Sequence, residues 1–207
     1  MKVIVATGNK DKVKEIREIL RDMDAIVVTM KEAGFFAEPE EDGSTFLENA
    51  VIKAKAVAGE AAEDDAWKDA IVMADDSGLV IDALNGEPGI YSARYLGHDT
   101  SYRVKNADLI RRLDGVPDER RSARFVCAVA AVCPDGKVLT AEGAMEGRIG
   151  YEERGENGFG YDPIFYLPEF GCTSAQLSLE DKNRISHRGK ALRAMREKLG
   201  AGLEENR

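Results

Sequence analysis

The sequence predicts an α/β fold with a mixed sheet, two lobes and a cleft between the lobes. In the first half, short apolar runs such as Lys2–Ala6 alternate with segments of helical periodicity, the first of which starts near Val13. In the second half, Arg124–Cys133 and Lys137–Glu146 flank a Pro-Asp-Gly turn, which predicts a β-hairpin. Because alternating strands and helices favour parallel pairing, a mixed sheet flanked by helices is expected, with a second lobe built largely from about residues 120–150.

Composition excludes several classes of function. A chain of 207 residues fits one domain, which we expect to span residues 1–207, and the formal charge of -9 makes it a poor binder of nucleic acid polymers or anionic membranes. A small phosphorylated ligand remains compatible through a local basic site. The odd set Cys127, Cys133 and Cys172 indicates reduced thiols and a cytoplasmic location, and no apolar run approaches the roughly 20 residues that cross a bilayer.

Two adjacent carboxylates follow the apolar run that ends at Met73. Asp75 and Asp76 precede Ser77-Gly78, so we expect a buried strand to present two carboxylates and a hydroxyl at a glycine turn. Ligands of α/β proteins collect at the carboxyl ends of strands, and neighbouring carboxylates repel unless a cation or a proton lies between them. This favours a Mg²⁺ or general-base site. Ordinary turn chemistry is an equally good reading of these residues alone.

A polar turn separates the first strand from the first helix. Backbone N–H groups and the positive end of the helix dipole face such a turn, which is typical of anion binding. It is not a Walker A loop, because that motif is absent from the sequence. The turn consists of Thr7, Gly8, Asn9, Lys10, Asp11 and Lys12.

An acidic loop precedes the second predicted helix. It contains Glu40 and Glu41, which are candidate metal ligands, although a solvated acidic loop is the commoner use of such a run. Thr45 to Glu48 forms a capping-box pattern that fixes the start of the helix. Asn49 and Lys53 then share its polar face, where Lys53 is placed for a charge pair or a phosphate contact.

Two later stretches are candidates for recognition of a ring. The first is rich in glycine and carries Phe159, Gly160, Tyr161 and Asp162; a loop with aromatics tucked beneath it is the alternative. The second is basic and carries Lys182, His187 and Arg188 just before a helix that is expected to end at Gly200. A lone histidine in that position is more often structural than catalytic.

Six motifs in this order resemble the inosine/xanthosine triphosphate pyrophosphatase family. The resemblance covers about residues 2–199 and no motif position departs from it. The motifs are Thr7-Gly8-Asn9-x-x-Lys12, Thr45-Phe46-x-Glu48-Asn49-Ala50-x-x-Lys53-Ala54, Ala74-Asp75-Asp76-Ser77-Gly78-Leu79, Pro88-Gly89-Ile90-Tyr91-Ser92-Ala93-Arg94-Tyr95, Gly158-Phe159-Gly160-Tyr161-Asp162-Pro163-Ile164-Phe165 and Ser186-His187-Arg188-Gly189-Lys190-Ala191-Leu192.

The resemblance implies a house-cleaning enzyme that splits deaminated purine nucleoside triphosphates (ITP or dITP, XTP or dXTP) into monophosphate and pyrophosphate with Mg²⁺. It further implies an elongated two-lobed fold and a homodimer. Asp76 would be the catalytic carboxylate, and Asp76, Asp75 and either Glu40 or Glu41 would hold the metal. Ser77, Lys53 and the Thr7–Lys12 turn would contact the substrate. The base would lie among Phe159, Gly160, Tyr161, Asp162, Lys182, His187 and Arg188.

Two alternatives remain. A Maf-like nucleotide pyrophosphatase would act on pyrimidine or modified nucleotides, but it leaves the Phe159–Asp162 and Ser186–Lys190 motifs without a role. A non-catalytic nucleotide sensor would bind triphosphates without turnover, and the Asp75-Asp76 pair argues against it.

Overall fold

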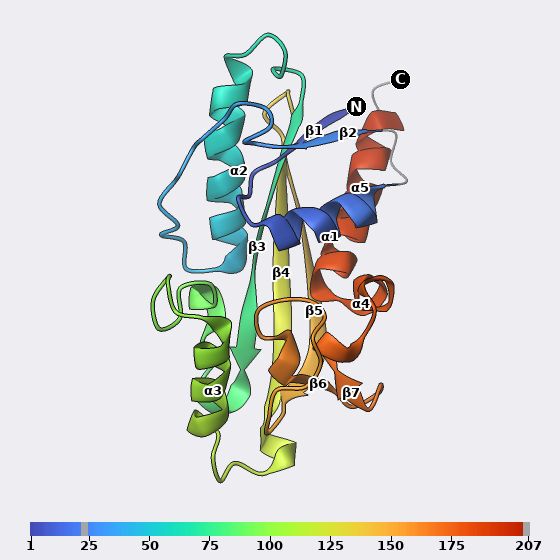
Figure 1. Ribbon diagram of the computed structural model, residues 1–207. Coiled ribbons are helices and arrows are strands. Elements are labelled where there is room, and N and C mark those ends of the chain that lie inside the picture. Colours follow the sequence, from blue (N-terminus) through green and yellow to red (C-terminus); the bar gives the residue numbers. More distant parts are fainter. Residues whose placement is uncertain (22–24, 205–207) are drawn as a thin grey trace. The chain divides into compact units, whose positions relative to one another are not determined.

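The computed structural model describes the backbone of residues 1–21 and 25–204, with side chains up to residue 200 (Figure 1). Its strands are β1 Lys2–Val5, β2 Ile26–Thr29, β3 Ile71–Ile81, β4 Ser122–Val132, β5 Val138–Ile149, β6 Phe165–Leu167 and β7 Cys172–Thr173. Its α-helices are α1 Lys10–Leu20, α2 Phe46–Ala62, α3 Tyr102–Arg112, α4 Leu179–Ile185 and α5 His187–Glu204. The strands form one sheet in the order β2-β1-β3-β4-β5-β6-β7. β1 pairs parallel with β2 and β3, whereas β6 pairs antiparallel with β5 and β7. The predicted α/β class with a mixed sheet flanked by helices is confirmed.

The chain divides into two compact units. The first unit contains Met1–Asp76, Cys127–Gly143 and the chain from Arg188 onward, and the second contains Ser77–Val126 and Ala144–His187. The lobe expected from about residues 120–150 is therefore divided, because the turn end of the hairpin packs in the first unit.

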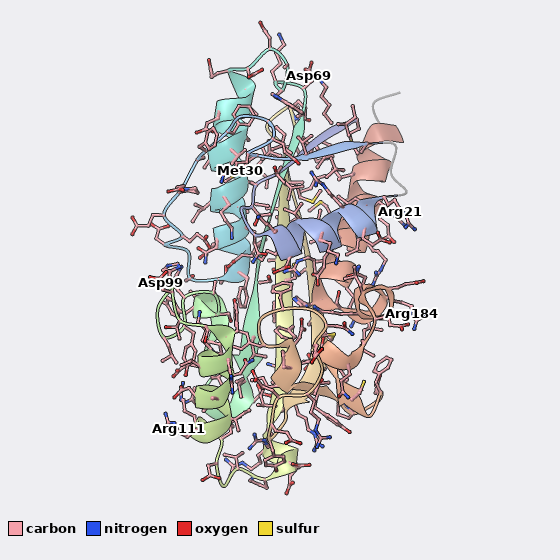
Figure 2. All side chains as sticks on the ribbon, viewed as in Figure 1. Arg21, Met30, Asp69, Asp99, Arg111 and Arg184 are labelled. Carbon is pink, nitrogen blue, oxygen red and sulfur yellow. The ribbon has the colours of Figure 1, made fainter. Side chains whose placement is uncertain are left out.

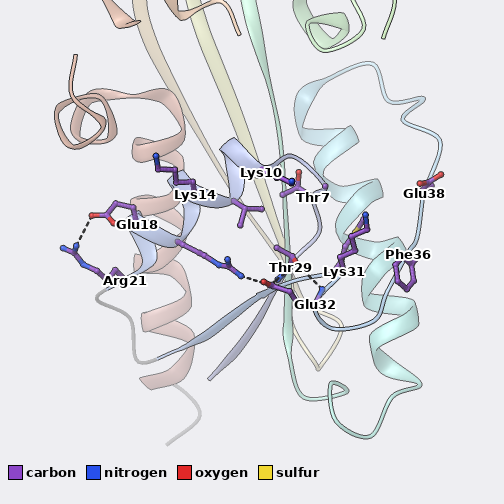
Figure 3. A pocket seen from close by; sticks show the side chains of 14 residues that line it. Thr7, Lys10, Lys14, Glu18, Arg21, Thr29, Lys31, Glu32, Phe36 and Glu38 are labelled. Carbon is purple, nitrogen blue, oxygen red and sulfur yellow. Dashed lines mark hydrogen bonds and ion pairs between the residues drawn. The ribbon is translucent and has the colours of Figure 1, made fainter. Parts of the chain in front are cut away.

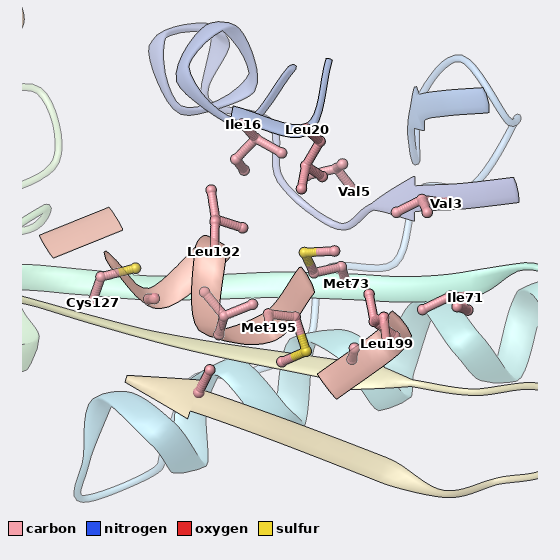
Figure 4. Close-up of a cluster of buried hydrophobic side chains, with 14 residues drawn as sticks. Val3, Val5, Ile16, Leu20, Ile71, Met73, Cys127, Leu192, Met195 and Leu199 are labelled. Carbon is pink, nitrogen blue, oxygen red and sulfur yellow. The ribbon is translucent and has the colours of Figure 1, made fainter. Parts of the chain in front are cut away.

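In the first unit, helices cover both faces of the sheet. Side chains alternate along β1, so Val3 and Val5 face one way and Ile4 faces the other. One face packs against α1 and α5, where Figure 4 shows Ile16 and Leu192 above the strands. The opposite face packs against the alanine-rich side of α2. All these side chains are almost completely buried, so packing on both faces holds β1 and the part of β3 that lies in the first unit in place.

The second unit has its own core. Leu79 and Ile81 at the end of β3 pack with Leu109 of α3 and with Phe165 of β6. Phe125 lies 4.4 Å from Phe165 between ring centroids. Each unit thus supports its functional side chains on a separate packed interior.

Three local predictions need correction. Asp75-Asp76-Ser77-Gly78 is not a turn, because β3 continues without interruption to Ile81. The α2 cap is half of the expected box: Thr45 accepts from the Glu48 N–H, but the Glu48 carboxylate bonds to Ser44 instead. The final helix does not end at Gly200, since α5 extends to Glu204.

Exposed charges are distributed over the described surface, as Arg21, Asp69, Asp99, Arg111 and Arg184 illustrate in Figure 2. Buried charges are fewer. Most of those described gather around Asp75 and around Asp162, and Lys105 and Arg121 are buried elsewhere in the second unit, where backbone carbonyls accept their hydrogen bonds. Among the described helices, none is both long enough and apolar enough to span a membrane.

Candidate active site

Asp75 and Asp76 point to opposite faces of β3. Ile71 and Met73 belong to the core under α1 and α5, and Val72 and Ala74 belong to the core under α2. The same alternation sends Asp75 toward the first core and Asp76 toward the second. The two carboxylates, which were expected together at one turn, therefore contact different cations: Asp76 contacts Lys53, and Asp75 contacts Lys12 and Arg188.

Asp76 lies beside the polar face of α2. Its Oδ1 is 3.2 Å from the Lys53 Nζ, and its Oδ2 accepts a 3.4 Å hydrogen bond from the Asn49 Nδ2. The same Lys53 Nζ lies 3.2 Å from Glu41 Oε2. Lys53 thus bridges two carboxylates. Glu41 is half-buried and Glu40 is exposed, so the acidic loop directs Glu41 toward this group.

The position of the acidic loop is supported by Asn49. Its Oδ1 accepts a 2.9 Å hydrogen bond from the Gly43 N–H while its Nδ2 donates to Asp76. A Cβ on Gly43 would lie 2.6 Å from that oxygen, so the close approach requires glycine. One buried amide therefore connects the loop that carries Glu41 to the strand that carries Asp76.

For both Asp76 and Lys53, burial and the neighbouring charges shift the pKa in opposite directions. Burial raises the pKa of the Asp76 carboxyl above its usual range, and the ammonium groups of Lys53 and Lys12 offset only part of that effect. For Lys53, burial would lower the pKa, but the carboxylates of Asp76, Asp75 and Glu41 outweigh it and the pKa is raised. Asp76 is consequently a stronger base than a free aspartate, next to a lysine that keeps its proton.

Asp75 belongs to a buried ion network. Its Oδ2 lies 3.0 Å from the Lys12 Nζ and 3.2 Å from the Arg188 Nε, and Arg188 also pairs with the buried Glu15 of α1. Burial would raise the pKa of Asp75, but Lys12 and Arg188 outweigh it and hold that pKa well below its usual range. The Asp75 side chain is only 1% exposed. Asp75 is therefore the shared ion-pair partner of Lys12 and Arg188.

The turn before α1 is closed by its own cap. The Asn9 Oδ1 accepts from the N–H groups of Asp11 and Lys12, and the Asn9 N–H donates to the Thr7 hydroxyl. An anion that used those two N–H groups would therefore have to displace the Asn9 side chain. Gly8 leaves open space around its backbone, and Lys10 and Asp11 are exposed.

A hollow of about 870 Å³ adjoins this turn in the first unit (Figure 3). It includes Thr7, Gly8 and Lys10 and continues along α1 past Lys14 to the segment after β2. Its other charged lining residues are Arg17, Glu18, Arg21, Lys31, Glu32 and Glu38. Basic groups outnumber acidic ones there, which suits an anion next to the turn.

The described residues fit a Mg²⁺ site that the substrate completes. Within those residues, no three His, Cys, Asp or Glu side chains gather into a metal-binding group. Mg²⁺ commonly uses one or two carboxylates together with substrate phosphates. Asp76 and Glu41 supply such carboxylates, and the ammonium of Lys53 between them shows that the position favours a cation.

In the second unit, the glycine-rich loop is organised around the buried carboxylate of Asp162. Its Oδ2 accepts from the Lys182 Nζ at 2.7 Å and from the Phe159 N–H at 2.9 Å, and its Oδ1 accepts from the Ser174 hydroxyl at 2.8 Å. Lys182 also lies 5.1 Å from the centroid of the Phe159 ring. A Cβ on Gly158 would meet Asp162 Oδ2 at 2.3 Å, so this packing requires glycine. Asp162 therefore fixes the backbone of Phe159, one of the residues expected to surround the base.

The remaining predicted residues of the second unit occupy defined places. The Tyr161 hydroxyl is buried and donates to the Ser92 carbonyl at 2.7 Å. His187 is buried with its ring stacked on Phe125 at 4.9 Å. Ser77 is half-buried on β3, directly after Asp76. The structure thus brings Phe159, Asp162 and Lys182 together, whereas His187 has a packing contact.

Glu15 and Ser174 complete these networks and were not predicted. A signal existed for Glu15, because it stands between Val13 and Ile16 on the apolar face of α1, where a carboxylate needs a partner. Ser174 carries no comparable pattern, since its role depends on a contact made twelve residues away from Asp162.

Comparison with models of known protein families assigns the chain to one family. The model of the Ham1 family matches residues 3–198. The chain belongs to the Ham1 family. The match confirms the resemblance stated from the six motifs, and it covers every residue that those motifs placed in the site.

Individual relatives of this Ham1-family chain agree. A dITP/XTP pyrophosphatase of Desulforamulus reducens is 49% identical over 199 residues, with 96% of each chain covered. The solved structure of the Staphylococcus aureus Ham1 protein has a TM-score of 0.83 at 40% identity and covers 100% of both chains. A HAM1 protein structure from Coxiella burnetii has a TM-score of 0.83 at 39% identity and covers 99% of both. These likenesses span the full chain, so no large part of it lies outside the family fold.

Proposed function

We propose that this Ham1-family chain hydrolyses oxopurine nucleoside triphosphates, ITP or dITP and XTP or dXTP, to the monophosphate and pyrophosphate. The observation that carries the proposal is the bridge of Lys53 between Asp76 and Glu41 in a chain of this family. Removal of such nucleotides would keep them out of DNA and RNA. The names of the relatives, which are dITP/XTP pyrophosphatases, support the same reaction.

The reaction is a displacement at the first phosphorus of the triphosphate. Asp76 orients a water molecule and accepts its proton, which its raised pKa favours. The water oxygen bonds to the first phosphorus, the bond from that phosphorus to the bridging oxygen breaks, and pyrophosphate leaves with the electron pair. Lys53 offsets the negative charge that grows on the phosphate oxygens. Lys12 and the Thr7–Lys10 turn are the proposed contacts of the phosphate chain.

Asp76 and Glu41 would hold Mg²⁺. When bound, the ion would neutralise phosphate charge and lower the pKa of a bound water. Of the predicted metal residues, Asp75 is enclosed by Lys12 and Arg188 and Glu40 is exposed, so we favour Asp76 with Glu41.

We propose that the second unit binds the base, with Phe159 stacking on the ring and Gly160, Tyr161, Asp162 and Lys182 shaping its surroundings. Hypoxanthine and xanthine carry an oxygen acceptor at position six, where adenine carries an amino donor. A site that offers donors there leaves them unpaired against adenine, which weakens its binding. Arg188 could contribute only by giving up its buried pairs with Asp75 and Glu15.

The two alternatives are less well supported. The Ham1 match over residues 3–198 does not favour a Maf-like enzyme. A non-catalytic sensor does not require a basic carboxylate at Asp76. A homodimer, a cytoplasmic location and the action of the whole chain as one domain stay predictions from the resemblance and from cysteine usage.

One assay tests the proposal. Purified protein with Mg²⁺ is given the triphosphates of inosine, xanthosine, adenosine, guanosine and thymidine, and both pyrophosphate and orthophosphate are measured. The proposal requires pyrophosphate from the first two in clear excess over the others. Turnover confined to thymidine triphosphate would favour the Maf-like alternative, and tight binding without turnover would favour the sensor.

A further inference from the structure

Asn106 of α3 connects this helix to the glycine-rich loop of the second unit. Its side chain is 1% exposed. The Nδ2 donates to the Gly160 carbonyl at 3.3 Å and to Glu153 Oε1 at 2.7 Å. Both partners can only accept, so the amide nitrogen must face them. A buried amide held in this orientation ties the backbone of the loop to the helix.

A second contact from α3 supports the same part of the loop. Gly160 has a φ of +68°, a left-handed conformation, and the Tyr102 ring lies 3.5 Å from where its Cβ would be. The Tyr102 and Tyr161 rings meet edge to face with centroids 5.2 Å apart. Asn106 and Tyr102 are one helical turn apart, so a single face of α3 contacts two successive loop residues.

The other end of this loop is held by Asp162. The Phe159 N–H donates to that carboxylate, and Lys182 lies against the Phe159 ring. The backbone next to the Phe159 ring is therefore held by two hydrogen bonds, one from the Phe159 N–H to Asp162 and one from Asn106 to the Gly160 carbonyl.

We propose that Asn106 is a positioning residue for recognition of the base. It holds the Gly160 carbonyl and thereby the Phe159 ring in the orientation that stacks on an oxopurine. The inference rests on the proposed function. Asn106 touches no reacting group, so its loss affects binding and selectivity and leaves the phosphorus chemistry of the first unit intact.

The test compares Asn106→Asp with Asp108→Asn. Asn106→Asp keeps the size of the side chain but turns an acceptor toward two acceptors. Asp108→Asn is the reverse exchange on the same helix, where Asp108 bonds to Tyr95 and Arg111 and not to the loop. We expect the KM for ITP to rise about fivefold to tenfold in Asn106→Asp, with kcat within about twofold of the wild type and a reduced preference for ITP over ATP. Asp108→Asn keeps the KM and the preference.

A double variant separates the two bonds of Asn106. In Asn106→Asp/Glu153→Gln, the new amide restores a donor toward position 106 while the Gly160 carbonyl still faces a carboxylate. The proposal requires the KM to stay raised. Full recovery would show that only the Glu153 bond matters and would overturn it.

Hydrogen exchange gives a readout that needs no activity. Asn106→Ala keeps the helix, because alanine is a strong helix former, and Tyr102→Leu removes the second contact. Both should speed amide exchange at residues 159–161 relative to Asp108→Asn. Unchanged exchange, unchanged KM or a fall in kcat at constant KM would each overturn the role of Asn106. A wild type that releases no pyrophosphate from ITP would instead refute the proposed function, and exchange at 159–161 would still decide the role of Asn106.

Discussion

The Lys53 Nζ lies 3.2 Å from Asp76 Oδ1, across the space between α2 and β3. Asp76 owes its position to the alternation of β3, and Lys53 owes its position to the polar face of α2, whose start is fixed by the Thr45 cap. The pair unites a group with a raised pKa and a cation that keeps its charge. It is the part of the molecule on which catalysis is proposed to depend.

Replacing Lys53 with Met should impair binding of the triphosphate and shift the pH profile. Loss of the ammonium removes the main charge that lowers the pKa of Asp76, so this pKa rises further. Because the base must be deprotonated, activity falls away on the acid side, and that limb of the kcat/KM profile should move to higher pH. Lys55 is exposed on the same helix, so Lys55→Met is the matched control. It should change neither the binding of the triphosphate nor the pH profile. An unshifted acid limb in Lys53→Met would contradict the assignment of Asp76 as the base.

Replacing Arg188 with Ala should first destabilise the protein. The change leaves the buried carboxylates of Asp75 and Glu15 without their shared guanidinium, and breaking a buried pair in this way costs about 3–5 kcal/mol. The exposed ion pair of Arg184 with Asp181 provides the control, and Arg184→Ala should cost about 0–1 kcal/mol. Urea unfolding measures both. Equal stability of the two variants would show that the buried network is not formed as described.

Gly158→Ala and Gly171→Ala separate backbone strain from collision. Both glycines have a positive φ, so both variants carry a similar penalty of about 1 kcal/mol. Only the Cβ at residue 158 meets the Asp162 carboxylate, at 2.3 Å, whereas no atom lies within 4 Å at residue 171. Steady-state kinetics should therefore show a raised KM for ITP in Gly158→Ala alone. A similar KM in the two variants would mean that Asp162 does not set the pose of Phe159.

Thiol reactivity should follow burial. Burial, together with the nearby Asp75 carboxylate, raises the pKa of Cys127 to about 12, and burial also raises that of the half-buried Cys133. At pH 8 iodoacetamide should modify the half-buried Cys133 and Cys172 and should spare Cys127 until the protein is unfolded in urea. The raised pKa of Cys127 in the fold also favours the native state below the pKa of the unfolded thiol, and this contribution is lost as the pH rises toward 12. Mass spectrometry monitors the modification. Modification of Cys127 in the folded protein would contradict its burial under α1 and α5.

The spacing of apolar residues was sufficient to predict most of the strands and helices. The strand expected at Lys2–Ala6 and the helix expected near Val13 follow from local pattern and are present as β1 and α1, because apolar spacing reports directly on which side is buried. Asp75-Asp76-Ser77-Gly78 misled because its residues favour turns, whereas packing on both sides of β3 keeps it extended. In β3, burial of the whole strand therefore outweighs the turn propensity of these four residues.

The site was predictable in its members more than in its geometry. Asp76 and Lys53 were named from motifs and Glu41 was named from the acidic loop as an alternative to Glu40; the structure brings these three side chains together. The separation of Asp75 from Asp76 follows once the strand is known to continue, because neighbours on a strand face opposite ways. Glu15 and Asn106 could not be assigned partners, since Arg188 and Gly160 are 173 and 54 residues away.

The most direct measurement is the product pattern and rate of Asp76→Asn with ITP and Mg²⁺, beside the wild type and the exposed control Asp65→Asn. The wild type and the control should release pyrophosphate and inosine monophosphate, and Asp76→Asn should lose about 10²–10⁴-fold in kcat while it remains folded. Unchanged turnover by Asp76→Asn, or release of orthophosphate by the wild type, would contradict the account.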